Sequence, residues 1–406
     1  MKILFITDNF YPEKNAPAKR TFEHASEWIK MGHEVSIITS VPNFPKGKVF
    51  KGYKNKLFQK ENINGINVNR VWTFISPNKG FFLRIIDYLS FMFSSFFMGL
   101  FTKKHDVVIA TSPQFFTLIA GYLISLFRRT SLVIEIRDLW PDSIVALGSM
   151  SENNFVVKIL YKISDFIYKK SSLIVVVTHS FKDYLIARNI NKEKIVVVKN
   201  GFNFERTLQP KMSLAQIEKL YDIKSDQFIV SYIGTIGMAH GIDTVVRAAE
   251  KARDIIFLII GEGAEKEKII ELCKNKRLDN LKVINSLNWQ QIVDINQIIS
   301  LNLIHLKDLK IFRTVIPSKI FESMALKKPI LAGLKGESLE IILESKSGVA
   351  VEPENENSLI ESIRLIQKDK SFLQTLSKNG HDFVKSKYDR KRLARKMIDF
   401  IELRVK

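Results

Sequence analysis

The sequence predicts an α/β protein built from two doubly wound domains in tandem. Three observations carry this prediction. Short apolar runs rich in β-branched residues alternate with longer helical stretches, the whole series occurs twice, and a polar segment containing Gly and Pro separates the two series. Continuous apolar runs are typical of strands buried on both faces of a parallel sheet. The 406 residues also suffice for two or three domains of about 150 residues each.

The expected strands fall into two groups along the chain. The first group covers residues 2–7, 34–39, 66–71, 106–111, 132–136, 173–178 and 195–199. The second group covers residues 228–233, 257–260, 281–284, 301–306, 329–332 and 348–351. A helix is expected over residues 20–31, because Gly32 stands where a C-cap glycine belongs.

The domain boundaries follow from the polar segment between the two groups. Residues 200–210 form the expected linker, because they are polar and include Gly and Pro. We therefore assign residues 1–200 to the first domain and residues 201–389 to the second. Residues 390–406 have the pattern of an amphipathic basic helix, and we expect this helix to pack back on the first domain.

Composition and charge exclude several classes of protein. Hydrophobic residues make up 46% of the chain and charged residues 26%, which excludes a disordered chain. The one cysteine excludes an internal disulfide and any multi-cysteine metal site, and it fits a reducing compartment. The net charge is +20, and residues 1–200, with 28 basic and 15 acidic residues, carry +13 of it. Six lysines alternate there with aromatic residues: Lys46, Lys48, Lys51, Lys54, Lys56 and Lys60.

Residues 81–101 form an apolar segment that is nearly long enough to cross a membrane. The segment contains Arg84 and Asp87, and each would cost about 2.5–3.5 kcal/mol at the centre of a bilayer. We therefore expect a helix that packs on its domain or lies in a membrane interface, and not a spanning helix.

The loops that follow the strands are where a doubly wound sheet binds its ligands. The loop after the first strand, residues 8–20, lacks the G-x-G-x-x-G fingerprint, which counts against a nicotinamide or flavin enzyme. Its small residues Ala16 and Ala18 precede a helix, an arrangement that suits a phosphate but also fits an ordinary loop.

Glycines gather after the first two strands of the second domain. Gly234, Gly237 and Gly241 follow one strand, and Gly261-Glu262-Gly263 follows the next. Glycine lets a backbone approach a ligand closely, although simple turn chemistry would use it as well. Two such loops in succession favour a nucleotide site.

Residues 316–325 carry the most informative motif. Pro317 suits the start of a helix, where it sets the backbone angle in advance. Ser318 and Lys319 then occupy the first turn, where the helix dipole disfavours a cation unless an anion is nearby. Glu322 lies one turn further on, and its carboxylate could accept hydrogen bonds from both hydroxyls of a ribose. The alternative is a surface Lys–Glu pair, worth about 0.3–0.5 kcal/mol.

These residues carry a family resemblance that extends over the whole chain. It resembles the retaining nucleotide-sugar glycosyltransferases of family 4, which have the GT-B fold of two Rossmann-like domains with an inter-domain cleft. Within that family it is similar to the bacterial transferases that build O-antigen and capsule units, including those for N-acetylfucosamine. The matching stretches are residues 8–20 with 32–35, 137–143, 234–243 and 317–325.

The resemblance implies a role for each matching segment of the second domain. This domain would bind the nucleotide sugar, with Glu322 on the ribose and Ser318 and Lys319 at the diphosphate. The loop at Gly261–Gly263 would flank the base, and the loop after the preceding strand would also contact the donor. The residues implied there are Gly234, Thr235, Gly237, His240, Gly261, Glu262, Gly263 and Pro317.

The resemblance gives the first domain the acceptor and part of the reacting centre. The loop at Asn15 and Ala16 would reach the distal phosphate. Asp138 and Arg137 lie where the family keeps residues at the reacting sugar. We expect Asp138 to position a group or handle a proton, and Arg137 to be its electrostatic partner; the alternative is a structural ion pair.

Three residues depart from the family pattern. Thr235 stands where Arg is usual, and His240 where Lys is usual. We therefore expect Lys319 to neutralise the diphosphate, with Arg313 or Lys307 nearby. Thr314 replaces the first Glu of the family's E-x7-E motif, which suggests a deoxy or N-acetylated donor sugar.

The expected function is transfer of a sugar from a UDP-linked donor to a polyprenyl-diphosphate-linked saccharide, with retention. No Asp-x-Asp metal motif is present in the sequence, so we expect neither a metal nor a cofactor. Such an acceptor implies a cytoplasmic enzyme attached peripherally to the inner face of a bacterial plasma membrane, with an anionic membrane surface as partner.

Two other functions stay open at this point. A nucleotide-sugar 2-epimerase would share the architecture and consume no acceptor. A non-enzymatic nucleic-acid binder would explain the charge of +20, but the sequence shows no nucleic-acid-binding motif, so we expect no nucleic-acid partner.

Overall fold

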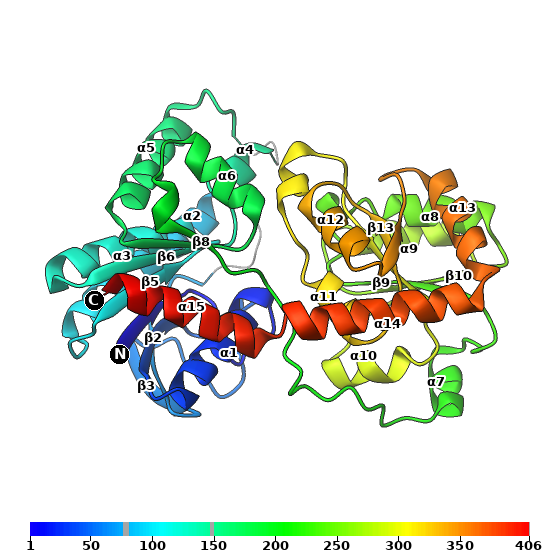
Figure 1. Cartoon of the computed structure of the whole chain (residues 1–406), viewed down its shortest axis with the longest axis horizontal. Helices are drawn as coiled ribbons and strands as arrows, with labels where there is room; N and C mark the ends of the chain where they lie inside the picture. The colour runs from blue at the N-terminus through cyan, green and yellow to red at the C-terminus, as the bar shows by residue number, and fades with distance from the viewer. Residues whose placement is uncertain (76–80, 147–149, 406) are drawn as a thin grey trace. The chain divides into compact units, whose positions relative to one another are not determined.

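The computed structural model describes residues 1–75, 81–146 and 150–405 (Figure 1). The chain divides into two compact units. Unit 1 consists of Met1–Asn200 together with Arg390–Lys406, and unit 2 of Gly201–Asp389. Each unit is an α/β domain with a predominantly parallel sheet, as the sequence predicts.

Unit 1 has an eight-stranded sheet in the order β3-β4-β2-β1-β5-β6-β7-β8. All neighbouring strands are parallel except β3 and β4. Each of the seven predicted strands forms. The strands are β1 (Lys2–Ile6), β2 (Glu34–Ser40), β3 (Phe58–Ile63), β4 (Ile66–Val71), β5 (Val107–Thr111), β6 (Ser131–Ile136), β7 (Leu173–Val176) and β8 (Ile195–Val197).

The additional strand β3 lies within and beyond the lysine-rich segment, where sequence analysis expected no strand. It joins β4 through Asn64 and Gly65, whose φ angles are +51° and +84°. Asn-Gly is the strongest short-range signal for a hairpin, so the sequence contained the information. Strand β3 is at the edge of the sheet and its side chains alternate between exposed and half-buried, and it therefore lacks the apolar run that marks the other strands.

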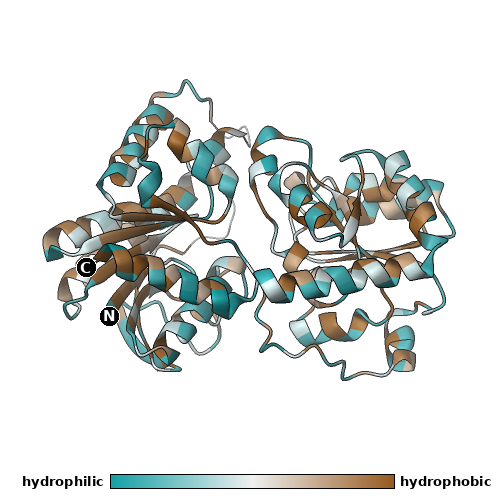
Figure 2. Ribbon diagram, in the orientation of Figure 1, coloured by the Kyte–Doolittle hydropathy of each residue, from teal (hydrophilic) through white to brown (hydrophobic). Residues whose placement is uncertain are grey.

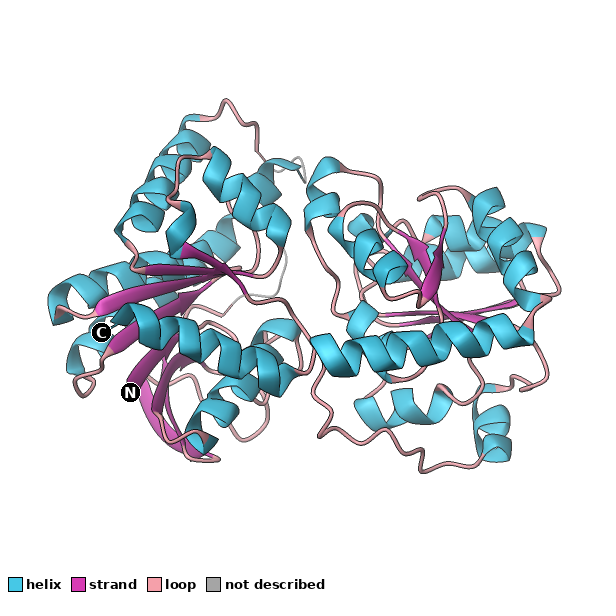
Figure 3. Ribbon diagram, in the orientation of Figure 1, coloured by secondary structure: helices cyan, strands magenta, loops and turns pink. Residues whose placement is uncertain are grey.

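Helices cover both faces of this sheet (Figure 3). Because side chains alternate along a strand, Leu4 and Ile6 of β1 pack on one face and Ile3 and Phe5 on the other. Helices α2, α3, α5 and α6 cover the first face, and α1 and α15 the second. The helices of unit 1 are α1 (Ala16–Lys30), α2 (Phe81–Phe101), α3 (Phe115–Arg128), α4 (Asp142–Ala146), α5 (Phe155–Lys170), α6 (His179–Ala187), η1 (Lys192–Lys194) and α15 (Arg390–Val405).

Helix α15 belongs to unit 1 although it follows unit 2 in the sequence. Its Met397, Ile398 and Ile401 are fully buried in the core shared with α1. The indole Nε1 of Trp28 on α1 donates to the carbonyl oxygen of Ala394 at 2.9 Å. Burying each large apolar side chain contributes about 1.5–3 kcal/mol, so unit 1 depends on the last helix of the chain.

Unit 2 has a six-stranded parallel sheet in the order β11-β10-β9-β12-β13-β14. Its strands are coloured predominantly as apolar in Figure 2. The strands are β9 (Ile229–Ile233), β10 (Ile256–Ile260), β11 (Leu281–Ile284), β12 (Leu301–His305), β13 (Ile330–Gly333) and β14 (Gly348–Ala350). The helices are α7 (Leu214–Tyr221), η2 (Met238–His240), α8 (Asp243–Lys251), α9 (Lys266–Asn275), α10 (Trp289–Ile295), η3 (Lys310–Thr314), α11 (Lys319–Ala325), α12 (Glu337–Glu344), α13 (Glu356–Gln367) and α14 (Lys370–Lys387).

The strand order of unit 2 defines where a ligand binds. The chain proceeds from β9 outward to β10 and β11, and then returns to the other side of β9 with β12. The crevice beyond the carboxyl ends of β9 and β12 is therefore the topological switch point. The loops that leave these two strands are residues 234–242 and 306–318.

Candidate functional site

The glycine-rich loop after β9 lies directly against the loop after β10. The N–H of Gly234 donates to Ile260 O at 2.8 Å, and the N–H of Ile236 donates to Glu262 O at 2.9 Å. A Cβ atom on Gly261 would lie 1.8 Å from Gly234 O, and one on Gly263 would lie 2.0 Å from Ile236 O. Gly261 and Gly263 are thus required by the packing of one loop on the other. The sequence led us to expect these glycines to allow a ligand close to the backbone, whereas here they allow one loop close to the other.

Lys319, the first residue of α11, extends to the start of this loop. A Cβ atom on Gly234, which has a φ of +147°, would lie 2.1 Å from Lys319 Cε. The ammonium of Lys319 donates to Tyr232 Oη at 2.6 Å and lies 4.0 Å from the centre of the Tyr232 ring. Tyr232 Oη in turn donates to Thr235 O at 2.6 Å. The fold therefore brings Lys319 to the glycine loop, through a tyrosine that sequence analysis did not select.

Burial lowers the pKa values of two basic side chains at the switch point, Lys319 and His240. Burial lowers the pKa of Lys319 to about 7, and Glu322 opposes this shift. Burial and the neighbouring Lys319 lower the pKa of His240 to about 4, so His240 is neutral at physiological pH. Because a nearby anion favours the protonated form of an amine, a bound diphosphate would raise the pKa of Lys319.

His305, the last residue of β12, connects the glycine loop to the segment before α13. Its Nδ1 lies 2.7 Å from His240 O, and its Nε2 accepts from the N–H of Glu354 at 2.9 Å. A backbone N–H can only donate, so Nε2 is the acceptor and Nδ1 carries the proton. Cβ atoms on Gly241 and Gly333 would lie 2.9 and 2.2 Å from this ring. Sequence analysis missed His305, because its partners are distant in the chain.

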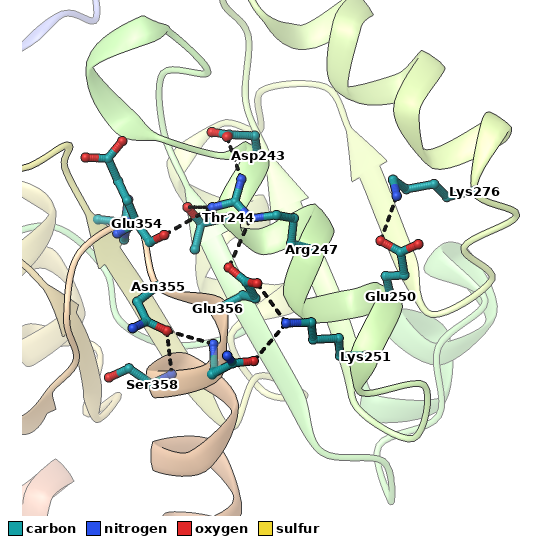
Figure 4. Close-up of polar contacts among 12 residues, drawn as sticks. Asp243, Thr244, Arg247, Glu250, Lys251, Lys276, Glu354, Asn355, Glu356 and Ser358 are labelled. Atoms are coloured by element: carbon teal, nitrogen blue, oxygen red, sulfur yellow. Dashed lines mark hydrogen bonds and ion pairs between the residues drawn. The ribbon is translucent and has the colours of Figure 1, made fainter.

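A network of charged residues anchors the end of the same loop (Figure 4). Arg247 donates to Asp243 at 2.7 Å, to Glu356 at 3.0 Å and to the carbonyl oxygen of Glu354 at 3.1 Å. Lys251 donates to Glu356 at 2.8 Å, and these hydrogen bonds lower the pKa of Glu356 to about 2. Asp243 closes the glycine motif and begins α8, and its partner Arg247 links it to Glu356 of α13.

Glu322 has a half-exposed carboxylate on α11. Its Oε1 lies 3.6 Å from Arg206 Nη1. The Arg206 guanidinium lies 3.6 Å from the centre of the Trp289 ring, which holds it in place. A ribose could reach the carboxylate of Glu322 from solvent and would compete with Arg206, a residue that sequence analysis did not select. Ser318 precedes Glu322 by one turn, and its carbonyl oxygen accepts from the Glu322 N–H at 3.2 Å. Pro317 and Ser318 are both half-buried.

The other expected cations differ in position. The N–H of Lys307 donates to Ala239 O at 2.9 Å, which places Lys307 beside the glycine loop. Arg313 donates two hydrogen bonds to Asp308, at 3.1 and 2.9 Å. Arg313 is therefore engaged in a surface ion pair.

Thr314, the residue that replaces the usual first Glu, donates to Ile311 O at 2.7 Å and lies at the end of η3.

Three more expected donor-site residues have simple surroundings. Thr235 is exposed, and its carbonyl oxygen is the acceptor for Tyr232. A Cβ atom on Gly237 would meet nothing closer than 3.7 Å, so the loop is open there. Glu262 is exposed and pairs with Lys266 at 2.9 Å.

Arg137 and Asp138 follow β6 at the carboxyl edge of the unit 1 sheet. Ser112 Oγ accepts from both of their N–H groups, at 2.8 and 3.2 Å. Burial raises the pKa of Asp138 to about 6, although hydrogen bonds from Ser143 and the Leu139 N–H oppose the shift. Among the residues that the structure describes, no ion pair joins Arg137 to Asp138.

Two nitrogens of the Arg137 guanidinium, Nε and Nη1, are buried without a hydrogen-bond partner among the described residues. Burial lowers the pKa of Arg137 to about 10, while the carboxylate of Glu135 opposes that shift, so the group stays protonated at neutral pH. Leaving a buried donor unsatisfied costs about 1–3 kcal/mol, and an anionic substrate group would remove that cost.

Asn15, in the loop after β1, caps the start of α1. Asn15 Oδ1 accepts from the N–H of Ala18 at 3.0 Å as the N-cap, while Asn15 Nδ2 donates to Asn9 Oδ1 at 2.9 Å. Ala16 is exposed and begins the helix, four residues before the predicted start. The N-cap explains the earlier start, since Asn is among the best N-cap residues.

Acidic groups gather in the same part of unit 1. Burial raises the pKa of Asp8, and the neighbouring Asp87 and Glu13 raise it further. The carboxylate of Asp87 accepts from Thr73 Oγ1 at 2.8 Å. Sequence analysis did not select Asp8 as a functional residue, because its position directly after β1 was the only available signal.

Two family profiles match the chain. Glycosyltransferase Family 4 matches residues 18–206, and Glycosyl transferases group 1 matches residues 214–383. The chain is a GT-B glycosyltransferase. The first profile lies almost entirely in unit 1, and the second lies in unit 2.

Individual glycosyltransferases are similar over nearly the full length. WcaI of Escherichia coli (strain K12), a glycosyl transferase assigned to colanic acid biosynthesis, is 24% identical over 382 residues, covering 90% of this chain and 91% of WcaI. Sucrose-phosphate synthase from Thermosynechococcus elongatus has a TM-score of 0.76 at 15% identity, covering 99% and 98% of the two chains. Anabaena HepE, solved with UDP and glucose, has a TM-score of 0.74 at 16% identity, covering 99% of both.

Proposed function

We propose that this glycosyltransferase moves a sugar from a UDP-linked donor to a polyprenyl-diphosphate-linked saccharide during synthesis of a surface polysaccharide such as O-antigen or capsule. The observation that carries the proposal is the Lys319 ammonium, with its lowered pKa, held against the glycine loop at the switch point of unit 2. The binding of UDP and glucose by HepE and the assignment of WcaI to colanic acid biosynthesis support the donor and the polysaccharide product.

The donor would bind to unit 2. Lys319 would face the diphosphate, and Glu322 would accept hydrogen bonds from the ribose hydroxyls. Thr314 stands where the family's first Glu is usual and has only a hydroxyl to offer. The donor sugar that fits such a site is a deoxy or N-acetylated hexose, with N-acetylfucosamine as an example.

The chemistry breaks the bond between the anomeric carbon and the β-phosphate oxygen and forms a bond from that carbon to the acceptor oxygen. The acceptor proton passes to the leaving phosphate, and the configuration is retained. The transition state is oxocarbenium-like, so the negative charge that develops on the diphosphate needs stabilisation. Lys319 would supply it, while Arg137 would hold an anionic group and Asp138 would position the acceptor.

A thermal-shift screen of nucleoside diphosphates and nucleotide sugars tests this proposal. A ligand at about 100 times its Kd adds about 2.7 kcal/mol of stability, which such a screen detects. UDP and UDP-sugars should give the largest shifts, and transfer of the selected sugar to a polyprenyl-diphosphate saccharide should follow. An epimerised nucleotide sugar with no acceptor consumed would support the 2-epimerase instead, and retention on DNA at physiological salt would support the nucleic-acid binder.

The acceptor determines the place of action. A polyprenyl-diphosphate saccharide cannot leave its bilayer, so we also propose peripheral attachment to the cytoplasmic face of a bacterial plasma membrane. In the described part of the chain, residues Leu83–Phe101 of α2 are long and apolar enough to cross a membrane, and 22% of this apolar stretch is buried. Phe91 of this helix belongs to the core of unit 1, which supports a helix that lies on its domain.

A further inference from the structure

We infer that unit 1 docks on an anionic bilayer through the outer face of α2, α3 and α5, here called the three-helix face. The inference rests on the proposed lipid-linked acceptor and adds the surface that meets the lipid. It replaces the lysine-rich segment, residues 46–60, as the principal contact. The face is defined by apolar side chains that are more than one-third exposed. They are Phe93, Phe97 and Phe101 of α2, Leu126 and Phe127 of α3, and Phe155, Val156, Ile159 and Phe166 of α5.

The extent of exposure is large for aromatic residues. Phe101 is 83% exposed, Phe155 75% and Phe127 64%. On α2 the three phenylalanines recur every four residues, so they form one stripe along the helix. A contiguous apolar surface of this kind marks an interaction site in a soluble protein.

Ring contacts join the three helices into one surface. Phe96 of α2 lies 5.4 Å from Phe97 and 5.6 Å from Phe127 of α3, between ring centres. Tyr122 of α3 lies 5.3 Å from Phe166 of α5. The apolar side chains of neighbouring helices are therefore connected, and Figure 1 locates the three helices within unit 1.

Close packing of α2 on α3 directs the stripe outward. A Cβ atom on Gly99 would lie 2.4 Å from Ile124 Cδ1, so the two helices approach closely at that glycine. Phe91 and Ser95 are fully buried on the same side of α2. Because that side of α2 is packed against the domain, the opposite side, which carries Phe93, Phe97 and Phe101, faces outward.

Cations lie on α5 and directly after the C-terminal ends of α2 and α3, on the same segments as the apolar side chains. Those that are exposed are Lys103, Lys104, Arg129, Lys158, Lys162, Lys169 and Lys170. Of the carboxylates on the same segments, Asp165 is neutralised by Arg188 at 2.8 Å, while Asp106 and Glu152 are exposed and are outnumbered by the seven cations. Rings that enter the interface while basic groups meet anionic headgroups are the pattern of peripheral membrane binding.

This charge selects the bilayer over a second copy of the chain. Two copies that met through the three-helix face would bring seven exposed cations of each into contact, and like charges repel. An anionic leaflet neutralises the same cations. At a lipid surface, aromatic rings can enter the apolar layer while the charged ends of long basic side chains stay among the headgroups.

The lysine-rich segment has fewer exposed apolar side chains than the three-helix face. Tyr53 lies under the Arg70 guanidinium, 4.9 Å from the ring centre, and is only partly exposed. Phe58, which begins the edge strand β3, is 42% exposed, and Phe44, two residues before the segment, is 38% exposed. Leu57 is the one fully projecting apolar side chain there, at 83%. The segment's six lysines can add attraction but cannot insert several rings.

Co-sedimentation with vesicles of phosphatidylcholine and phosphatidylglycerol tests the inference. The parent protein should bind at low salt, and the variant with Phe93→Ser, Phe97→Ser, Phe127→Ser and Phe155→Ser should bind about tenfold more weakly or worse. The matched control changes the six lysines of the segment to Gln and should bind within about threefold of the parent. A parent protein that ignores anionic vesicles, or a weaker lysine variant beside an unchanged phenylalanine variant, would overturn the inference.

A second measurement covers the case in which the phenylalanine variant does not fold. In a Cys273→Ser background, Phe97→Cys carrying an environment-sensitive dye should shift to the blue on vesicles, whereas Leu57→Cys should shift less. Light scattering without lipid should show a monomer; a dimer that the phenylalanine changes dissociate would assign the face to a second copy. UDP thermal shifts should be equal in all variants, so a failed membrane claim is distinguishable from a failed donor claim.

Discussion

The Nε2 atom of His305 accepts a hydrogen bond from the backbone N–H of Glu354, 2.9 Å away and 49 residues along the chain. The other ring nitrogen of His305 lies 2.7 Å from the carbonyl oxygen of His240. One buried, neutral imidazole thus joins the loop after β9 to the segment before α13. The glycine loop is therefore held by a residue of the neighbouring strand β12.

The first prediction concerns this imidazole and pH. Burial lowers the pKa of His305, so below about pH 6.5 the unfolded chain binds a proton that the folded chain does not. The contribution of His305 to stability is complete above that pH and is lost as the pH falls toward the folded pKa. His305→Asn keeps a donor for His240 but leaves the Glu354 N–H unpaired, at a cost of about 1–3 kcal/mol at pH 8.

Urea unfolding at pH 8 and pH 5.5 measures both effects. The loss of stability on acidification should be smaller in His305→Asn than in the parent. His179→Asn, at an exposed position, is the control and should match the parent at both pH values. Equal acid sensitivity in parent and His305→Asn would show that other buried histidines, such as His24 and His105, account for the effect.

The second prediction concerns Lys319. Since its pKa is about 7, affinity for a nucleoside diphosphate should fall as the pH rises from 7 to 9, by up to about tenfold per pH unit. Lys319→Ala should lower turnover by about 100-fold or more, because the cation is most valuable when the diphosphate leaves. Lys319→Arg should bind with little pH dependence, because guanidinium does not titrate there. Turnover of Lys319→Ala within a few-fold of the parent would place the diphosphate elsewhere.

The third prediction concerns Glu322. Glu322→Gln should weaken UDP binding by about 10- to 150-fold, the equivalent of a charge-assisted hydrogen bond of about 1.5–3 kcal/mol. Isothermal titration measures the change, and the unfolding midpoint should stay near that of the parent. Glu340→Gln, an exposed carboxylate on α12, is the control for charge alone. If both variants bind UDP as the parent does, Glu322 is not the ribose ligand.

The fourth prediction separates two glycines of the donor loops. Gly261→Ala should lower stability by about 1–3 kcal/mol or more, because its Cβ would lie 1.8 Å from Gly234 O. Gly237→Ala should be nearly neutral for stability, because its Cβ would meet nothing within 3.7 Å. Denaturant unfolding measures both. A stable Gly261→Ala protein would mean that the two loops separate more easily than their hydrogen bonds suggest.

The fifth prediction concerns metal ions. The sequence has no Asp-x-Asp motif, and under the proposed function Lys319 would take the role that a divalent ion has at the diphosphate. Transfer should therefore proceed at an undiminished rate in EDTA. A rate that disappears in EDTA and returns with Mn²⁺ or Mg²⁺ would contradict this expectation.

The architecture could be predicted because its signals are local. An apolar run of five residues marks a buried strand wherever it occurs, and all thirteen expected strands form. Strand β3 was missed because an edge strand buries little and therefore has no apolar run. The start of α1 also has a local signal, the N-cap residue Asn15 followed by Pro17, but the predicted helix began later, at residue 20.

The sequence by itself determined which segments along the chain form strands and helices, the family, and the residues that stand at the carboxyl ends of the strands. Only the tertiary structure decided what those residues do. It brought Lys319 to Tyr232, 87 positions earlier, and used Gly261 to seat one loop on another. It also left the phenylalanines of α2, α3 and α5 on one exposed face. The physical reason is that periodicity and capping act over a few residues, whereas hydrogen bonds, burial and pKa shifts depend on neighbours that folding brings from distant parts of the chain.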